Sequence, residues 1–465
     1  MKVVFVGGGS HSLLGPLRSV MADARAIGDG EINLYDLNVD RARTIGQLLM
    51  KTPEYAVSKP RIVWGTSLEQ ALEGADAVGV VLMAGSRKSH RMGDLVSRNR
   101  GFLSSDNVSP NGAMLAIKGG RILMGIARKM EQHCPEALLI DFVNPVAVLS
   151  AMVNHHTRIR ALGVCAGYSN HRWHLARICG RDEPEPDLVV DVAGVNHLSF
   201  ILRGSCKGRD LFELLEEKLH PDWKMSPLQS WWGPIWSGVI RDSVTNLVRI
   251  YRELGVLIYS TERDGMSHLL PYDEQVKQFR KATASLTPGQ IDRDEDQERA
   301  TRAETDRRFQ EYANQDLDQE FWAEQWRHDL SLRRQDDDIY VQILRGMGAG
   351  VPTRIVASAP NRGAVEGFKD RTVLEFTQVI SGKTIEPAGR FAVPDAVQGM
   401  VSGLAAHQTM LADAIATEDP RLLAHALLAY PEQPYSRAIR LLYRDLFEVN
   451  AEEIPGPLAA AKVLL

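Results

Sequence analysis

The first third of the chain alternates short apolar runs with amphipathic stretches. Runs rich in β-branched residues predict strands at Val3–Val6, Glu31–Tyr35, Arg61–Trp64, Ala77–Met83, Ala137–Phe142 and Ala161–Val164. Helical periodicity predicts helices at Leu13–Ala26, Val39–Leu49, Leu68–Glu73 and Gly112–Cys134, and from about Ala147. Strands that alternate with helices in this way are typical of an α/β fold with a Rossmann-type, doubly wound parallel sheet.

The pattern changes after Gly167. Leu188–Val192 and Leu198–Leu202 are strand-like, and long helical stretches follow. Ile291–Glu311 is densely charged and lacks a strong apolar stripe, which is typical of a solvated helix or a mobile segment. We therefore predict an NAD-binding domain at residues 1–165. A mixed α+β, helix-rich domain at 166–465 would bind substrate and metal and form oligomer contacts.

Composition and charge narrow the class of protein. The 465 residues are 44% hydrophobic and 24% charged, as in ordinary globular proteins. The formal charge of -5 argues against a nucleic-acid or membrane-surface role. No apolar run approaches the roughly 18 residues that a membrane span needs. Four cysteines are too few for a disulfide framework, and no secretory signal is recognisable, so we expect a cytoplasmic protein.

A glycine-rich turn follows the first predicted strand. Gly7, Gly8, Gly9 and Ser10 precede the first helix, where glycines let a phosphate approach the backbone and the helix N-terminus. Asp36 ends the second strand. A carboxylate there can accept hydrogen bonds from the ribose hydroxyls and repel the 2′-phosphate of NADP. Ser12 breaks the full GxGxxG pattern, so a plain turn and a solvated Asp36 are the alternatives. The combination predicts NAD.

Polar clusters lie downstream, near the ends of predicted strands. They are Asp106–Gly112, Asn144–Pro145, Cys165 and Asn196–His197. Because the carboxyl ends of parallel strands share one edge, Asn144 and Cys165 are expected near the nicotinamide. A thiolate and an imidazole can hold a divalent metal with positions open for substrate. Buried packing of the cysteine and a structural role for the histidine are the alternatives.

These motifs together resemble glycoside hydrolase family 4, the NAD- and divalent-metal-dependent glycosidases, along nearly the whole chain. The similar segments are Val4–Ser10, Asp106–Gly112 ("GDT-x-G-x-GG"), Asp141–Pro145 ("TNP"), Leu162–Cys165, Gly194–Leu198 ("G-[LIV]-NH") and Tyr259–Glu262 through Pro271–Tyr272. The last resembles the "P-T-E…LPY" stretch of the branch that acts mainly on α-glycosides. Asn111 stands where the family has a glycine.

The resemblance implies a lactate/malate dehydrogenase-like fold, a homodimer or homotetramer, and hydrolysis of an α-linked glycoside. In that family, resident NAD⁺ transiently oxidises C3 of the sugar. The metal, usually Mn²⁺, then assists removal of the C2 proton, and elimination and water addition follow. This chemistry differs from the paired-carboxylate route of most glycosidases.

The resemblance also assigns residues. The metal ligands would be Cys165 and His197, and Asn144 would contact the substrate. Apart from the resemblance, we also expect Asn196 and Arg91 to contact the substrate. Asn144 would also lie against the cofactor. Asp106 would hold a substrate hydroxyl or orient the metal site. Arg87, Lys88 and Arg91 could meet an acidic substituent of the sugar, although a surface role is the alternative.

Two departures affect the substrate pocket. Ala166 follows the cysteine, where the family often has His, Asn or Asp. Asp264–Gly265 stands in place of an acidic-His pair. The expected base for the C2 proton is Asp264, and the other candidates are Glu262, Tyr259 and Tyr168.

Two other classes of function remain open. The protein could be a dehydrogenase that oxidises a sugar or hydroxy acid without bond cleavage. It could also be a nucleotide- or sugar-binding protein that has lost catalysis. The presence of both Cys165 and His197 argues against the second.

Overall fold

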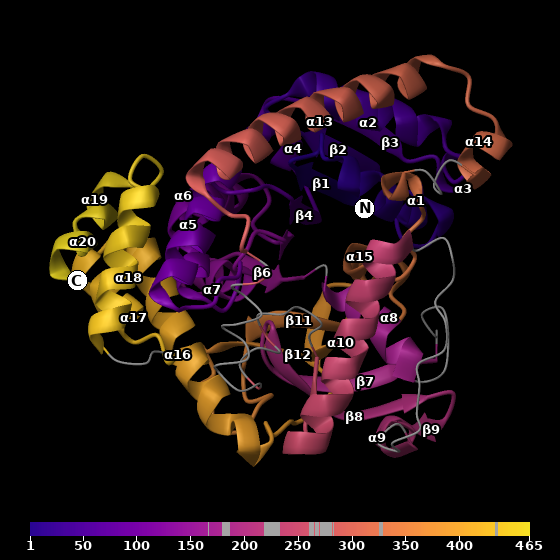
Figure 1. Cartoon of the computed structure of the whole chain (residues 1–465). Helices are drawn as coiled ribbons and strands as arrows, with labels where there is room; N and C mark the ends of the chain where they lie inside the picture. The colour runs from indigo at the N-terminus through magenta and orange to yellow at the C-terminus, as the bar shows by residue number, and fades with distance from the viewer. Residues whose placement is uncertain are drawn as a thin grey trace.

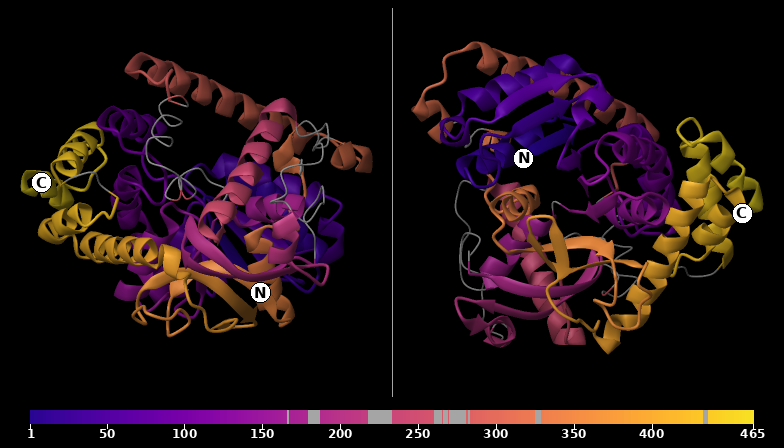
Figure 2. Two further views of the ribbon diagram at one scale, coloured as in Figure 1. Left: turned by 60° about the horizontal axis from the view of Figure 1, so that its bottom comes forward. Right: turned by 180° about the vertical axis from the view of Figure 1, so that it is seen from behind.

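The structure is a computed structural model of the whole chain (Figure 1). It describes residues 1–165, 167–178, 187–217, 233–259, 265, 269, 281, 283–324, 329–432 and 436–465. All strands in these residues belong to one thirteen-stranded mixed sheet. Helices pack on both faces of the sheet (Figure 2).

Six parallel strands form the first half of the sheet. They are β1 (Lys2–Val6), β2 (Glu31–Tyr35), β3 (Arg61–Gly65), β4 (Ala77–Val80), β5 (Leu138–Asp141) and β6 (Arg160–Gly163). Their spatial order is β6-β5-β4-β1-β2-β3, with every neighbouring pair parallel. This confirms the predicted doubly wound fold. The strand order reverses between β1 and β4, which is where such sheets open a crevice for ligands.

The helices of this half mostly match the predicted segments. After the 3-10 turn η1 (His11–Leu13) they are α1 (Leu14–Ala22), α2 (Val39–Lys51), α3 (Tyr55–Ser58), α4 (Leu68–Leu72), α5 (Arg87–Arg100), α6 (Pro110–His133) and α7 (Val146–His156). The predicted first helix is too long, because Asp23 accepts hydrogen bonds from Arg25 N–H and Arg345 Nε and turns the chain. The hydrophilic helix α5 is not among the predicted helices, because it has no clear apolar stripe. It begins after Ser86, whose side chain caps the helix by accepting a hydrogen bond from Ser89 N.

The second half of the sheet is mainly antiparallel. Its strands are β7 (Val189–Val195), β8 (Leu198–Cys206), β9 (Arg209–Asp210), β10 (Leu257–Ile258), β11 (Thr353–Pro360), β12 (Val373–Ser381) and β13 (Thr384–Pro387). β11 joins the first half by pairing Ser358 with Gly163 of β6. The predicted domain boundary at residue 165 therefore falls within a continuous sheet. The separate roles expected for residues 1–165 and 166–465 stay a prediction.

The remaining helices belong to the second part of the chain, and several of them pack on the first half. They are α8 (Gly167–Ile178), α9 (Leu211–Glu216), α10 (Gly233–Leu254), α13 (Pro288–Asn314), α14 (Gln319–Glu324), η5 (Leu330–Leu332), α15 (Ile339–Ala349), α16 (Asp395–Thr417), α17 (Pro420–Leu428), α18 (Ser436–Val449), α19 (Gly456–Ala459) and α20 (Ala461–Leu464). α16 packs on α6 and α7 and so ties the end of the chain to the first half. Among the described helices, none has the length and apolarity of a membrane span.

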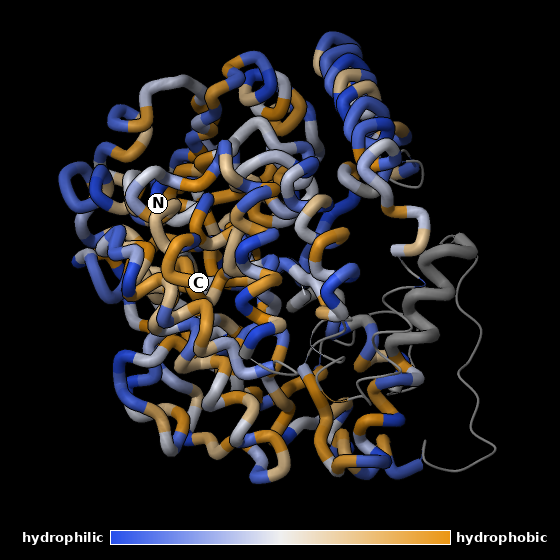
Figure 3. Tube along the Cα trace, turned by 60° about the vertical axis from the view of Figure 1, so that its left-hand side comes forward, coloured by the Kyte–Doolittle hydropathy of each residue, from blue (hydrophilic) through white to orange (hydrophobic). Residues whose placement is uncertain are grey.

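The charged segment Ile291–Glu311 lies within α13 and is a helix, one of the two predicted forms. Figure 3 shows this long helix as largely hydrophilic, whereas hydrophobic positions gather around the sheet. Only Ile291, Phe309 and Ala313 of its side chains are buried. α13 lies along α2 and α5, across the first half of the molecule (Figure 1).

A buried ion pair fixes the C-terminal region against α5 and α6. Glu453 accepts hydrogen bonds from Ser86 N (3.0 Å) and Ser89 Oγ (2.6 Å) and pairs with Lys118 Nζ (3.1 Å). Only 2% of the Lys118 side chain is exposed. Burial raises the pKa of Glu453, but the two serine hydrogen bonds and the Lys118 charge outweigh it and lower the pKa to about 2.

We expect Glu453→Gln to lower the free energy of unfolding at pH 7 by about 1–3 kcal/mol, because it leaves the Lys118 charge buried without its anion. The folded pKa is depressed, so this stabilisation is complete above the unfolded value near 4.5 and disappears as pH falls toward about 2. Urea unfolding at several pH values measures it. Glu452→Gln, an exposed neighbour, is the control; an equal loss in both variants, or one independent of pH, would contradict the assignment.

Candidate functional site

The glycine turn after β1 is built so that no side chain fits. Gly7 has φ of +89°, and a Cβ there would lie 1.9 Å from Val81 O. A Cβ on Gly8 would lie 2.7 Å from the Leu34 backbone. The Gly7 and Gly8 N–H groups donate to Tyr35 O at 2.9 and 2.8 Å, which locks the turn onto the end of β2. The sequence signal for these glycines therefore has a steric basis.

Asp36 closes the same turn from the end of β2. Its Oδ2 accepts from Gly9 N at 2.9 Å and its Oδ1 accepts from Asn38 N at 2.8 Å. Ser10 N donates to Gly7 O, so the four N–H groups of residues 7–10 all have acceptors within the protein. The carboxylate is thus held in place, and each oxygen retains a lone pair for a further donor.

A cleft of about 910 Å³ opens beside this turn. Gly7, Gly9, Ser10 and Asp36 line it, and so do residues from the ends of β4 and β5. Leu37, Met83 and Ile122 also line it, and these large apolar side chains are 87%, 52% and 45% exposed. β4 ends at Val80, before the predicted Met83, and Val81, Leu82 and Met83 line the cleft. Exposed apolar side chains beside a fixed carboxylate suit an adenosine moiety.

Cys165 and His197 come together at the carboxyl edge of the sheet. Cys165 follows β6, and His197 lies in the two-residue turn between β7 and β8. Cys165 Sγ is 3.3 Å from His197 Nε2, and Gly167 N at the start of α8 donates to the sulfur at 3.2 Å. Ligands of one tetrahedral ion, at 2.1–2.3 Å from it, lie about 3.6 Å apart. The donor pair therefore fits two ligands of a single metal ion.

The turn that carries His197 is constrained. His197 has a φ of +68°, a left-handed conformation that is rare for such a residue. Glu375 of β12 is buried and accepts from Asn196 Nδ2 at 2.8 Å and Ser199 Oγ at 2.5 Å. Burial raises the pKa of Glu375, although these two hydrogen bonds oppose the rise. Asn196 thus lies against Glu375 in the interior, and its predicted contact with substrate stays a prediction.

The loop before α6 connects the metal pair to a second polar group. Asn107 Nδ2 lies 3.2 Å from His197 Nε2, and its Oδ1 accepts from Val146 N at the start of α7. Asp106 accepts from Asn144 Nδ2 at 3.3 Å. The predicted residues Asp106, Asn144, Cys165 and His197 are therefore brought into one region through Asn107, which belongs to the predicted polar cluster Asp106–Gly112 but has no separate predicted role.

His90 is a further residue of this region that no sequence pattern singles out. Its Nε2 lies 3.1 Å from Asp106 Oδ1. Burial lowers the pKa of His90, but the hydrogen bond to Asp106 and the charge of Asp94 raise it above its ordinary value. Asn111, which replaces a family glycine, donates to His90 O and Asp94 Oδ1, both at 3.1 Å. That substitution thus fixes the part of α5 that carries His90.

The cations of α5 point elsewhere. Arg91 pairs with Asp294, Arg87 with Glu298 at 2.9 Å and Lys88 with Asp292 at 2.6 Å, all on α13. In this structure they meet acidic side chains of the protein. The predicted contact between Arg91 and substrate stays a prediction.

The expected base at C2 is not placed. Asp264 and Glu262 lie outside the described residues, as does Ala166. Tyr168 is in α8, but its side chain is not described. Tyr259 is buried, with its ring 4.4 Å from that of His171 between centroids.

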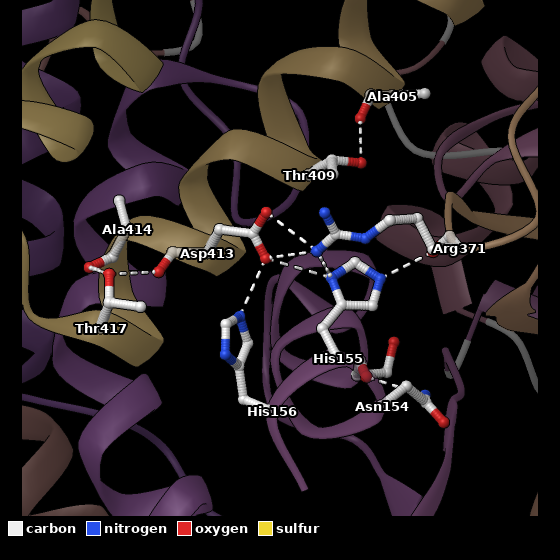
Figure 4. A network of polar contacts seen from close by, with 10 residues as sticks. Asn154, His155, His156, Arg371, Ala405, Thr409, Asp413, Ala414 and Thr417 are labelled. Carbon is white, nitrogen blue, oxygen red and sulfur yellow. Dashed lines mark hydrogen bonds and ion pairs between the residues drawn. The ribbon is translucent and has the colours of Figure 1, made fainter.

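A second group of potential metal ligands occurs between α7 and α16. His156 Nε2 and His155 Nδ1 lie 2.9 and 3.3 Å from Asp413 Oδ1 (Figure 4). The Arg371 guanidinium donates to both oxygens of Asp413, at 2.7 and 2.9 Å. Because a cation already neutralises this carboxylate, we assign the group to packing between the helices and not to a metal.

A doubly wound sheet with a glycine turn after its first strand is typical of a dinucleotide-binding protein. The thiol and imidazole at the same edge of the sheet are suitable ligands for a metal ion. The chain belongs to glycoside hydrolase family 4. The model of the family 4 glycosyl hydrolases matches residues 2–180, and that of their C-terminal domain matches residues 192–432. The predicted family and fold class are confirmed.

Relatives and solved structures agree with this membership. The alpha-galacturonidase of Thermoanaerobacter italicus is 24% identical and that of Bacillus subtilis 25%; the matches cover 98% and 96% of this chain and 98% and 97% of the relatives. A gut-microbial 6-phospho-alpha-glucosidase, solved with NAD and glucose-6-phosphate, aligns with a TM-score of 0.77 at 17% identity, covering 98% of this chain and 99% of that one. A Thermotoga maritima 6-phospho-beta glucosidase, solved with manganese, NAD⁺ and glucose-6-phosphate, gives 0.73 at 16% identity, with the same coverage. At these identities the structures show a shared fold.

Proposed function

We propose that this protein is an NAD- and Mn²⁺-dependent glycosidase that hydrolyses α-linked glycosides. One observation carries the proposal: Cys165 Sγ lies 3.3 Å from His197 Nε2, and this pair is at the same edge of the sheet as the cleft beside the glycine turn. The relatives named alpha-galacturonidase match nearly their whole length and support the α-linkage. The solved relatives with NAD and manganese support the two cofactors.

The residues that would hold the cofactors are those already placed. The turn Gly7–Ser10 and Asp36 would hold the dinucleotide, with Asn144 near its nicotinamide end. Cys165 and His197 would hold the metal. Bound NAD would supply a reversible hydride acceptor for C3 of the sugar, and the metal a Lewis acid for the oxidised sugar.

The chain's own groups would position the sugar and move protons. Asn144 and Asp106 would hydrogen-bond its hydroxyls, and His90 fixes the orientation of Asp106 from α5. We propose Asp264 as the base that removes the C2 proton, with Tyr168 as the second candidate. From the family resemblance we also propose a cytoplasmic homodimer or homotetramer.

We propose an α-galacturonide as the substrate, because the named relatives act on that class. Binding of its carboxylate by Arg91 would require the Arg91–Asp294 pair to open. Asn196 would contact substrate only if its amide left Glu375.

The test is a panel of chromogenic α- and β-glycosides that includes galacturonides, each with NAD⁺, with Mn²⁺, with both and with neither. We expect turnover of an α-glycoside that requires both cofactors and leaves no net NADH. Stoichiometric accumulation of NADH would instead identify a dehydrogenase. Tight sugar binding without turnover or bound metal would identify a protein that has lost catalysis. Either result would overturn the proposal.

A further inference from the structure

One wall of the cleft beside the glycine turn comes from α13. Arg302 of this helix lines the cleft, together with His11 and Arg41 from the first half of the chain. Arg302 is far from the other lining residues in sequence, and no feature of the local sequence separates it from the many exposed charges of α13. Only the tertiary arrangement brings this cation to the dinucleotide cleft.

A stripe of four charged residues faces the first half of the molecule from α13. At helical intervals of four it consists of Asp294, Glu298, Arg302 and Asp306. Residues spaced in this way lie on one face of a helix. The three acidic members pair with cations across the interface: Asp294 with Arg91, Glu298 with Arg87, and Asp306 with Arg41. Asp306 also contacts the imidazole of His11. The fourth member is the cation that lines the cleft.

The position of Arg302 along the cleft follows from its neighbour. Asp306 lies 3.2 Å from the Nε2 of His11, which starts η1 directly after the glycine turn. Four residues earlier on α13, Arg302 stands about 6 Å along the helix axis from that contact. Arg302 and the glycine turn thus line the same cleft, and a dinucleotide places its pyrophosphate against such a turn. The side chain of Arg302 has no hydrogen bond or ion pair with any described residue.

The turn itself offers few donors to a phosphate. The N–H groups of residues 7–10 all donate within the protein, so they are not available as the main donors to a phosphate. Asp36 adds a negative charge beside them. A basic side chain that reached a pyrophosphate in this cleft would therefore add a compensating charge that residues 7–10 do not supply.

The two ends of α13 are held by apolar contacts, whereas its central part is held by ion pairs. Ile291 packs with Leu95 and Leu286 at one end, and Phe309 stacks against the His11 ring at the other, with centroids 4.4 Å apart. Between Ile291 and Phe309 no side chain of the helix is buried, and the ion pairs form the contacts. Solvent-accessible ion pairs weaken as salt screens them.

We propose that Arg302 binds the pyrophosphate of the dinucleotide and that α13 closes the cleft over the bound cofactor. The inference rests on the proposed NAD site. It adds a binding residue from a segment of the chain that the nucleotide motif does not include. Because the helix is held by ion pairs, release of the cofactor becomes faster as ionic strength rises.

The test is fluorescence titration of NADH binding to the full-length protein, with calorimetry for NAD⁺. We expect Arg302→Gln to weaken NADH binding about tenfold or more, because a hydrogen bond to a charged group is lost. Arg302→Lys should recover part of this loss. The dependence of affinity on salt should be shallower in Arg302→Gln than in the wild type. Arg299→Gln is the matched control, since Arg299 is an exposed arginine of the same helix that pairs with Glu295.

A second variant tests closure without touching Arg302. Asp294→Asn combined with Glu298→Gln removes two anchors of α13, and stopped-flow displacement should show several-fold faster release of NADH. An unchanged release rate would overturn the closure. Equal NADH affinities in Arg302→Gln and Arg299→Gln would overturn the pyrophosphate contact. A loss confined to NADPH would also overturn it, because Arg302 would then read a 2′-phosphate. If the wild type binds no dinucleotide, the proposed cofactor itself is wrong.

Discussion

Cys165→Ala is expected to lower the turnover of an α-glycoside by about a thousandfold or more. The substitution removes one of two donors that lie 3.3 Å apart, and with it the metal that would polarise the oxidised sugar. Mn²⁺ binding, measured by electron paramagnetic resonance or calorimetry, should be lost in parallel. NADH affinity should change by no more than about twofold, because the glycine turn belongs to another strand end.

Cys134→Ala provides the control for this prediction. Cys134 is buried at the end of α6, and burial raises the pKa of its thiol to about 11, as expected for a packed and unreactive cysteine. Its removal should leave turnover and metal binding near the wild-type values. Retained Mn²⁺ affinity in Cys165→Ala would exclude the sulfur as a ligand, whatever happened to the activity.

Gly7→Ala is expected to abolish dinucleotide binding and to lower the free energy of unfolding by about 2–5 kcal/mol. The added Cβ would lie 1.9 Å from Val81 O, and backbone cannot yield as a flexible side chain would. The φ of +89° is also unfavourable for alanine. NADH titration and urea unfolding measure the two effects separately.

Gly65→Ala is the matched substitution for Gly7→Ala. Gly65 ends β3, two strands away from β1, and a Cβ there would meet no atom within 4 Å. In Gly65→Ala the free energy of unfolding should change by less than about 1 kcal/mol, and the affinity for NADH should be close to that of the wild type. If Gly7→Ala bound NADH as well as Gly65→Ala does, the turn after β1 would not be the dinucleotide site.

The strands and the family could be predicted from local patterns. Apolar runs such as Val3–Val6 and Ala161–Val164 are buried on both faces of the sheet, so they are recognised as short continuous runs of β-branched and apolar residues, without polar alternation. The strand ends then place Cys165 and Asn144 at one edge without further information. The polar cluster Asn196–His197 is visible in the sequence, and the family resemblance adds its role as a metal ligand, but its proximity to Cys165 depends on the pairing of β7 and β12 across the sheet.

Other parts of the site carry no local pattern. His90 lies on a hydrophilic helix, Glu375 is one acidic residue within an apolar strand, and nothing in the sequence separates Asn107 from its neighbours in the cluster Asp106–Gly112. Each becomes recognisable only by its partner: Asp106, Asn196 or His197. These partners come from elements far apart in sequence, and a single sequence contains no information on such pairs.

Local sequence was sufficient for the doubly wound sheet, the glycine turn with its carboxylate, and the family. These features depend on side-chain periodicity and on backbone conformations that few residues allow, so neighbouring residues are enough to specify them. Tertiary packing was needed to join both halves in one sheet, to set Glu375 against the His197 turn, and to bring Arg302 of α13 to the cleft. Those outcomes depend on which surfaces pack together. A charged helix such as α13 has no apolar stripe from which its packing position could be predicted. Its position depends mainly on the cations with which its acidic residues pair.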